Sequence, residues 1–312
     1  MSNTNYILIT PCKNEENHLL DLFNSLSAQT VRPLLWVIVD DGSTDSTPEM
    51  ISQILSKNQW VLSLRLESKK RDIGKHVYYV YNSGFNFSME YCRNNGMNYE
   101  YIGNIDADMV LNEDDYFQRM IDTFETNPKI GIMSSKVYSR SKNKLIEEND
   151  KGNLPMGSPR LWRKNCFNET DGYPLSYSAD SVSNIIAKKK GWDLLTLDTI
   201  GATQARRTSS AGGLWKGYII HGKSAYYRNY SFLFVVLKSF KLCFNNPYYI
   251  GIAYFYGFLL STLCKDEKLQ NQEILNYYHN EKFKETLSIY MKIYNQKINR
   301  FPDMLHKKKE NH

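Results

Sequence analysis

The sequence has 312 residues, of which 42% are hydrophobic, and 39 basic against 33 acidic residues leave a formal net charge of +6. This apolar content suffices for a buried core and excludes a wholly disordered chain. The positive charge is too small and too scattered for the dense basic stripe of a nucleic-acid binder, so we expect no nucleic-acid partner. The five cysteines lack zinc-ligand or redox spacing, and the N-terminus lacks the features of a secretory signal. We therefore expect a cytoplasmic protein with reduced thiols.

The N-terminal part of the chain alternates between strand and helix patterns. Apolar, β-favouring runs predict strands over 6–10, 34–39, 60–66 and 99–105. Helical patterns follow these runs, over residues 19–26 and 74–93. A further helix follows the second run, with Asp45 or Ser46 as its N-cap and Pro48 in its first turn. Such alternation predicts an α/β fold with a mostly parallel central sheet flanked by helices.

Beyond residue 112 the pattern is less regular. Helices are predicted over 114–125 and 178–190, with a strand over 131–138 between them. The stretch from Ser139 to Lys164 is polar and contains several glycines and prolines, so it is predicted to be a mobile loop.

The composition changes again after Lys223, where tyrosine, phenylalanine and leucine become dominant. We divide the chain into a catalytic domain and an aromatic-rich helical extension. The domain covers 1–225, with a nucleotide-binding half over about 1–105 and a metal and acceptor half over 106–225, and the extension covers 226–312.

The longest apolar run, residues 247–264, is only about as long as the shortest membrane-spanning helix. It also contains four tyrosines, which favour an interface over the centre of a bilayer. Three interpretations stay open: a pair of core helices, a helix in the plane of the cytosolic membrane face, and a membrane span. Peripheral membrane contact, association with the inner face of the membrane and oligomer formation are therefore left open.

Acidic residues follow two of the predicted strands. Asp40 and Asp41 follow one strand, and Asp106 and Asp108 follow another. Ligands collect at the carboxyl ends of parallel strands, so we expect these clusters to face a shared pocket. Carboxylate oxygens suit Mg²⁺ or Mn²⁺, which often keep substrate phosphates as ligands and could stabilise a departing diphosphate at Asp106 and Asp108. The carboxylates at 40 and 41 could accept hydrogen bonds from a nucleobase or ribose.

The combined motifs resemble those of a known family. They are Thr10-Pro-Cys-Lys-Asn-Glu15, Val39-Asp-Asp-Gly-Ser-Thr-Asp45, Gly74-Lys75, Asn82-Ser-Gly84, Ile105-Asp-Ala-Asp108, Asp171-Gly-Tyr173 and Ala179-Asp180. Over roughly residues 5 to 225 the chain resembles the family-2 glycosyltransferases, which have the GT-A fold. The resemblance implies an inverting enzyme that moves a sugar from a nucleotide-sugar donor, a UDP-sugar in the first instance, to a hydroxyl of a glycan or lipid-linked acceptor.

The resemblance also implies a role for each matching residue. The nucleotide pocket would be lined by Thr10, Pro11, Glu15 and Lys75, and Asp41, with Asp40 behind it, would hold the base. Asp106 would approach the ribose and the metal, and Asp108 would ligate the metal. Asp180 would be the general base, and Arg206 with Arg207 would neutralise the diphosphate. The expected cofactor is Mg²⁺ or Mn²⁺.

The sequence departs from the family at two of these positions. Ala179 stands where most members have an acidic residue before the base. Thr208 replaces the tryptophan that follows the Gln-x-x-Arg motif of processive synthases, which argues against processive synthesis, whereas a role in polysaccharide biosynthesis is still expected. Two other functions stay open: a sugar nucleotidyltransferase, disfavoured because residues 10–15 lack glycine, and a non-catalytic nucleotide-sugar-binding protein. His221 is expected to be a structural histidine, with metal ligation as the alternative.

Overall fold

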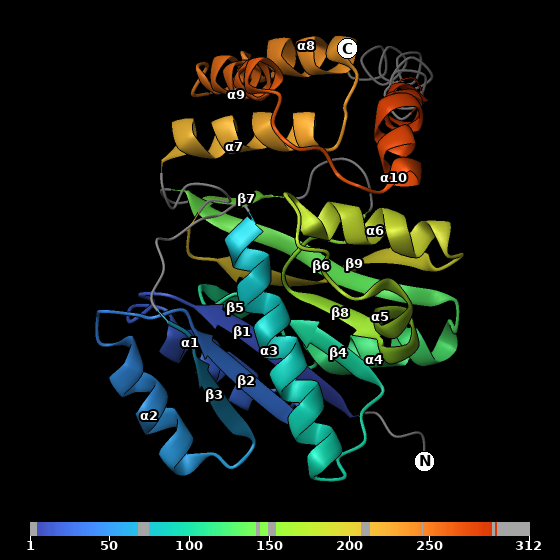
Figure 1. The fold of residues 1–312 in the computed structure, drawn as a ribbon. Helices are drawn as coiled ribbons and strands as arrows, with labels where there is room; N and C mark the ends of the chain where they lie inside the picture. Colours follow the sequence, from blue (N-terminus) through green and yellow to red (C-terminus); the bar gives the residue numbers. More distant parts are fainter. Residues whose placement is uncertain are drawn as a thin grey trace, which may run out of the picture. The chain divides into compact units, whose positions relative to one another are not determined.

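In the computed structural model of this chain, the structure describes residues 5–67, 75–141, 144–148, 154–206, 213–244, 246–288 and 291. Tertiary contacts divide the chain into two compact units, Met1–Gly217 and Tyr218–His312. Each unit is described by itself below (Figure 1).

The first part of the central sheet is parallel, with the strand order β3-β2-β1-β4. These strands are β1 (Tyr6–Cys12), β2 (Leu35–Asp40), β3 (Val61–Arg65) and β4 (Tyr101–Asn104). The helices between them are α1 (Leu19–Ser27), α2 (Thr47–Lys57) and α3 (Lys75–Asn94). All of β2 is buried, as expected for an inner parallel strand that reads as a continuous apolar run. The predicted alternation of strands and helices is confirmed here.

Helices cover both faces of this parallel part. Leu8 of β1 belongs to the core that α1 and α4 cover, and Ile9 points to the opposite core, which α3 covers. A Cβ atom on Gly84 of α3 would lie 2.6 Å from the Cγ2 atom of Val39. Glycine at this position therefore lets α3 pack closely over the ends of β1 and β2.

The second part of the sheet is mixed, and it continues from β4 in the order β8-β6-β9-β5. Its strands are β5 (Met109–Leu111), β6 (Ile130–Ser141), β7 (Lys144–Glu147), β8 (Arg160–Arg163) and β9 (Asp193–Gln204). Its helices are α4 (Tyr116–Thr126), α5 (Lys164–Thr170) and α6 (Ala179–Lys189). Strand β8 is antiparallel to both of its neighbours, whereas β6 and β9 are parallel.

The prediction of a loop over 139–164 is wrong where three strands and a helix lie. β6 extends to Ser141, and α5 begins at Lys164. Strand β7 occupies 144–147, and β8 forms a central strand of the sheet between β4 and β6. The polar character of β8 is misleading because the Arg160 side chain is buried, with its guanidinium carbon 4.4 Å from the centre of the Trp162 ring. A buried arginine that stacks on an aromatic ring packs as a core residue.

The C-terminal unit is helical, so the predicted helical extension is confirmed. It contains most of α7 (Leu214–Tyr227), together with α8 (Phe232–Leu242), α9 (Ile250–Cys264), α10 (Gln272–Asn276) and one π-helical turn, η1 (Tyr277–Glu281). A Cβ atom on Gly222 would lie 2.0 Å from the carbonyl oxygen of Tyr254, so α7 and α9 cross at a glycine contact. Within the described ranges, no helix has both the length and the apolar character needed to cross a membrane. The boundary between the units and the predicted domain boundary after residue 225 both fall within α7.

Candidate active site

The carboxyl ends of β1, β2 and β4 meet at one edge of the sheet. In the two parallel registers, Cys12 lies opposite Asp40, and Ile9 lies opposite Asn104. Just beyond β2, the amide of Asp41 donates a hydrogen bond to the carbonyl oxygen of Cys12 at 2.9 Å. The acidic clusters that follow β2 and β4 therefore lie at the same edge of the sheet, as the strand and helix order predicts.

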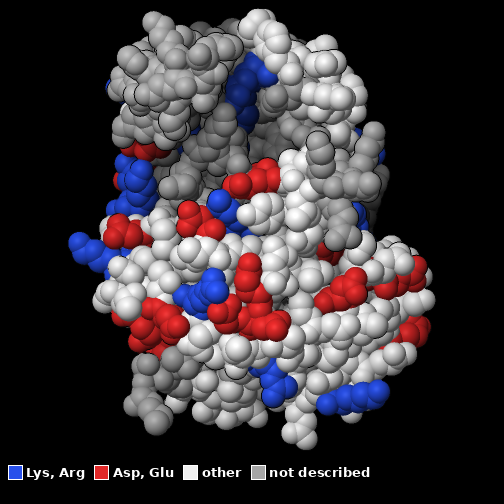
Figure 2. Space-filling view, turned by 180° about the vertical axis from the view of Figure 1, so that it is seen from behind, with Lys and Arg blue, Asp and Glu red and all other residues white. Residues whose placement is uncertain are grey.

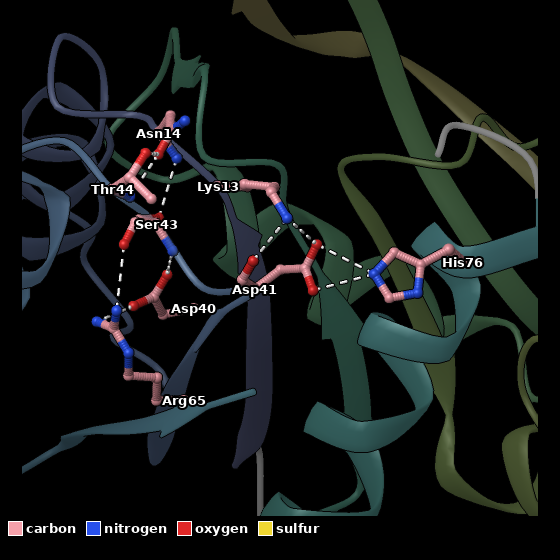
Figure 3. Close-up of polar contacts among 8 residues, drawn as sticks. All are labelled: Lys13, Asn14, Asp40, Asp41, Ser43, Thr44, Arg65 and His76. Atoms are coloured by element: carbon pink, nitrogen blue, oxygen red, sulfur yellow. Dashed lines mark hydrogen bonds and ion pairs between the residues drawn. The ribbon is translucent and has the colours of Figure 1, made fainter. Parts of the chain in front are cut away.

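Asp40 stabilises the turn that follows β2. Its carboxylate accepts hydrogen bonds from the amide of Ser43 and from the guanidinium of Arg65, each at 2.8 Å (Figure 3). Gly42 in this turn has a φ of 67°, in the left-handed region that favours glycine. Asp40 is buried, so these contacts fix the backbone behind Asp41.

Asp41 contacts two cationic or polar side chains that we did not predict. The Nζ atom of Lys13 lies 3.1 Å from the Asp41 carboxylate and 2.8 Å from its carbonyl oxygen, and the Nε2 atom of His76 lies 3.0 Å from Oδ1 (Figure 3). These three residues come from the loop after β1, the loop after β2 and the start of α3. The only signal in the sequence was their place within or next to the matching motifs.

Other residues predicted around the nucleotide differ in their surroundings. Thr10 is buried, and its hydroxyl accepts a hydrogen bond from the Nε1 atom of Trp36 at 2.9 Å, so this side chain is engaged with β2. Pro11 is the residue before the end of β1. The side chain of Lys75 and the whole of Arg207 lie outside the described residues.

Arg206 joins two acidic residues that are distant in the sequence. Its Nη2 atom lies 2.6 and 2.7 Å from the two carboxylate oxygens of Glu15, and its Nε atom lies 3.0 Å from Oδ2 of Asp108. Both carboxylates are buried, whereas the arginine side chain is about one-third exposed. The residues predicted for the nucleotide, the metal and the diphosphate thus meet in one cluster.

Asp106 lies beside this cluster and has a raised pKa. Burial and, after it, the charge of Asp108 raise the pKa of Asp106 from 3.8 to about 6, against the opposing effect of hydrogen bonds. The hydroxyl of Tyr81 donates one of these hydrogen bonds to the carboxylate. The amide of Asp106 donates to the hydroxyl of Ser158 at 2.7 Å. Negative charge is therefore concentrated at this point of the sheet edge.

The acidic pair fits a divalent cation that also binds a phosphate. In the described part of the chain, no three or more His, Cys, Asp or Glu side chains are grouped as a metal site. Mg²⁺ sites, however, often use one or two carboxylates and complete the coordination with substrate phosphates and water. A cation would also relieve the repulsion that raises the pKa of Asp106. Asp106 and Asp108 therefore suit a site that needs a diphosphate for completion.

Three tyrosines connect the acidic pair to α6. Tyr78 and Tyr81 of α3 and Tyr173 have ring centres 5.3–6.0 Å apart. Tyr81 donates to Asp106, and Tyr78 donates to the carboxylate of Asp180 at 3.4 Å. Burial, then the charge of Asp180, and more weakly those of Tyr173 and Asp106, raise the pKa of Tyr78. The predicted metal ligand and the predicted base thus lie at two ends of one aromatic cluster, which the sequence did not reveal.

Asp180 lies in the first turn of α6, where the helix dipole favours a negative charge. The buried guanidinium of Arg160 donates to the carbonyl oxygen of Asp180 at 3.3 Å and to the Asn184 side chain at 2.8 Å. A Cβ atom on Gly157 would lie 3.4 Å from the Cβ atom of Asp180. Strand β8 and the loop before it therefore fix the start of α6.

His221 lies on α7 in the C-terminal unit. Burial, and next the charges of Lys238 and Arg228, lower the pKa of His221 from 6.5 to about 4. Its ring centre lies 5.5 Å from that of Tyr218 in a T-shaped arrangement. These surroundings stabilise the uncharged imidazole.

The comparisons with known proteins decide the family. The profile of the family described as "Glycosyl transferase family 2" matches residues 7–184, which is more than half of the chain. The chain belongs to this family. The relationship predicted from the motifs is therefore confirmed, and the match includes every predicted site residue except Arg206 and Arg207.

A protein with an assigned activity also matches in sequence. The poly-beta-1,6-N-acetyl-D-glucosamine synthase of Staphylococcus epidermidis is 29% identical over 138 residues. This alignment covers 43% of the present chain and 29% of the synthase, so the chain spans less than one-third of that relative's length.

Solved structures share the fold at low sequence identity. S. aureus TarS 1–349 in complex with UDP-GlcNAc has a TM-score of 0.52 at 18% identity, with coverage of 71% of this chain and 66% of TarS. The mannosyltransferase PcManGT from Pyrobaculum calidifontis, in complex with GDP-Man and Mn²⁺, has a TM-score of 0.52 at 13% identity, with coverage of 84% and 76%. The predicted GT-A type of α/β fold is confirmed.

Proposed function

We propose that this chain is an inverting glycosyltransferase that moves a sugar from a nucleotide-sugar donor to a hydroxyl of a glycan or lipid-linked acceptor. One observation carries the proposal: Tyr81 and Tyr78 connect a carboxylate pair at the sheet edge to a separate carboxylate, Asp180, at the start of α6. An inverting transfer needs the donor's diphosphate and the general base on opposite sides of the sugar, so it needs two separate carboxylate sites of this kind. Family membership supports sugar transfer as the reaction class. The enzyme would act in the cytoplasm, as the cysteine pattern and the N-terminal residues indicate.

On the donor side, Asp41 would accept hydrogen bonds from the nucleobase. Asp40 stabilises the turn after β2, and Lys13 and His76 hold the Asp41 carboxylate at the carboxyl end of this strand. Arg206 would pair with the diphosphate, because a guanidinium binds phosphate oxygens in a bidentate manner. UDP-GlcNAc and GDP-Man in the two structures with this fold support a nucleotide-sugar donor, and we take a UDP-sugar as the first candidate.

Asp106 and Asp108 would hold a Mg²⁺ or Mn²⁺ ion. Bound there, it would screen the charge of the leaving diphosphate. The presence of Mn²⁺ with PcManGT supports this assignment. Because Arg206 now contacts both Glu15 and Asp108, donor binding would also redistribute these ion pairs.

On the acceptor side, Asp180 would act as the general base. Its carboxylate would take the proton of the acceptor hydroxyl as that oxygen forms a bond to the anomeric carbon. The bond from this carbon to the diphosphate oxygen would break on the opposite face, and the nucleoside diphosphate would leave with the electron pair. Tyr78 and the start of α6 would keep Asp180 oriented for this step.

Two other functions would use parts of the same site. A sugar nucleotidyltransferase would join a sugar 1-phosphate to the α-phosphate of a nucleoside triphosphate and release pyrophosphate, so it would release no nucleoside diphosphate. A non-catalytic binding protein would bind the donor and release nothing. Residues 10–15 contain no glycine, which disfavours the phosphate-binding loop of the first alternative.

The test is the release of nucleoside diphosphate from a panel of nucleotide sugars with Mn²⁺ or Mg²⁺, followed by donor binding to three variants. We expect slow UDP release without an acceptor, which disappears in Asp108→Ala. Asp180→Asn should bind the donor normally but lose transfer, while Asp193→Asn, an exposed change on β9, should retain both. Donor binding without any release by the wild type would contradict the proposal and favour the binding protein.

A further inference from the structure

The C-terminal unit has an apolar face on α8 and α9. We call it the α8–α9 face, and its side chains are 36–80% exposed: Phe232, Leu233, Val236, Leu237, Phe240, Phe244, Tyr249, Ile252, Tyr256 and Leu263. On α8 the exposed positions recur at helical spacing along one stripe, as on an amphipathic helix. An exposed apolar patch of this kind marks an interaction site.

The two helices that form this face are packed tightly on each other. A Cβ atom on Gly251 of α9 would lie 2.3 Å from the carbonyl oxygen of Ser239 of α8. Val235 and Ser239 on α8, and Ala253 and Tyr254 on α9, are buried. The outward residues are therefore presented by a fixed helix pair whose other sides already form a core.

The charges on the chain from α7 to the end of α9 have a single sign, and the first acidic residues, Asp266 and Glu267, follow α9. Between Asp198 and Asp266 the sequence contains no aspartate or glutamate. The basic residues in this interval are Arg206, Arg207, Lys216, Lys223, Arg228, Lys238, Lys241 and Lys265. Two of them, Lys238 and Lys241, belong to α8 itself. The surface over α9, at the upper right in Figure 2, is white, with basic side chains beside it.

From these observations we propose that the α8–α9 face binds in the plane of an anionic lipid bilayer surface. Its aromatic and aliphatic side chains would enter the boundary between headgroups and acyl chains, and Lys241 would stay at the level of the lipid phosphates. Tyr249 and Tyr256 suit this depth, because tyrosine combines an apolar ring with a polar hydroxyl.

The charge pattern favours lipid over a second copy of the chain. A two-fold dimer through this face would place Lys241 of both copies at the interface, and neither α8 nor α9 contains an acidic residue to compensate them. An anionic membrane compensates such charges, and each basic residue near its surface strengthens binding. The proposal goes beyond sugar transfer and does not depend on it, because lipid binding needs no donor.

The test is flotation of the full chain with vesicles of phosphatidylcholine alone or mixed with phosphatidylglycerol. We expect binding to the mixed vesicles and little binding to phosphatidylcholine, with a decrease at high salt. Substitution of Phe240→Ser and Phe244→Ser should weaken binding roughly tenfold for each ring, because each removes buried apolar area. Lys241→Glu should weaken it about fivefold or more.

The control is the pair Leu145→Ser and Leu175→Ser, which removes two residues of similar exposure, 58% and 57%, from the other unit. It should bind vesicles like the wild type. Equal binding to both vesicle types, no binding by the wild type, or an equal loss in the control would overturn the proposal. So would a concentration-dependent dimer that the phenylalanine substitutions dissociate, since the second copy would then be the occupant. If the double variant does not fold, Lys241→Glu and the salt series decide.

Discussion

The guanidinium of Arg206 lies 3.0 Å from the carboxylate of Asp108, although 98 positions separate them in the sequence. The same guanidinium contacts Glu15 at 2.6 Å. A residue proposed to hold the metal is thus paired with a residue proposed to hold the diphosphate. When the donor and the cation bind together, the ion pair between Arg206 and Asp108 would break. Arg206 would then contact the diphosphate, and Asp108 would contact the cation.

Replacement of Arg206 by glutamine should lower the stability of the chain and increase the stabilisation that Mn²⁺ provides. Without the arginine, the buried carboxylates of Glu15 and Asp108 lose its positive charge, so we expect the free energy of unfolding to fall by about 1–3 kcal/mol. The measurement is the melting temperature with and without Mn²⁺. Mn²⁺ should raise it more in Arg206→Gln than in the wild type.

Arg119→Gln is the control for this prediction, because it removes an exposed ion pair with Asp115 and an exposed hydrogen bond to the carbonyl oxygen of Thr199. It should leave both the stability and the Mn²⁺ effect nearly unchanged. Equal Mn²⁺ effects in Arg206→Gln and the wild type would contradict the assignment of a cation to this cluster.

Tyr78→Phe should slow transfer without weakening donor binding. The hydroxyl donates to Asp180 at 3.4 Å, so its removal frees the proposed base while the ring stays packed against Tyr81 and Tyr173. We expect kcat to fall about threefold to tenfold, the range for one hydrogen bond, with the KM for the donor unchanged. Steady-state kinetics of transfer measure both values.

Tyr91→Phe, farther along α3, removes a hydroxyl that has no part in this cluster and should leave kcat unchanged. A parallel increase of KM in Tyr78→Phe, or an equal loss in Tyr91→Phe, would show a general structural effect instead of orientation of the base.

Much of the parallel half of the fold could be predicted from the sequence. In the mixed half, β6, α4 and α6 were predicted, but β5, β7, β8 and β9 were not. The strands β1 and β2 are continuous apolar runs that burial on both faces requires, so their pattern is unambiguous. Strand β8 has arginines at both ends, and Arg160 is buried through contacts with Trp162 and Asn184 that no local pattern contains. Strand β9 includes a register shift opposite β6, which interrupts its alternation.

The candidate site was predictable where residues follow strands and hidden where they lie on helices. Asp41 and Asp108 follow apolar runs, so strand order alone brings them to one edge. His76, Tyr78 and Tyr81 lie on α3, where aromatic residues at helical spacing are equally typical of a core. Their contacts with the aspartates depend on how α3 crosses the sheet.

Asp41→Asn should weaken donor binding more than it slows transfer. The substitution removes the charge that Lys13 and His76 hold in place and that would accept hydrogen bonds from the base. We expect the dissociation constant of the donor to rise about tenfold, because charged hydrogen bonds are stronger than neutral ones. Calorimetric titration with UDP and with GDP measures this change.

Asp21→Asn, an exposed change on α1, is the matched control and should bind both nucleotides like the wild type. An unchanged affinity of Asp41→Asn for every nucleotide tested would remove Asp41 from the base-binding role.

His221 should make stability dependent on pH in the acidic range. Its pKa is lowered to about 4 in the folded chain, so between pH 4 and 6.5 the unfolded chain binds a proton that the folded chain excludes. Its contribution is complete above pH 6.5 and is lost as the pH falls toward 4, by up to about 3 kcal/mol.

Urea unfolding of the wild type and of His221→Gln between pH 4 and 8 tests this prediction. As the pH falls through this range, the free energy of unfolding of the wild type should decrease relative to that of His221→Gln. A difference that is independent of pH would contradict a buried, uncharged His221.

The most direct test of the central claim is a crystal structure of the full chain with a nucleotide sugar and Mn²⁺. We predict the nucleobase against Asp41, the diphosphate and the ion between Asp108 and Arg206, and the anomeric carbon open toward Asp180. A donor bound elsewhere, or one whose diphosphate lies away from Asp106 and Asp108, would contradict the account.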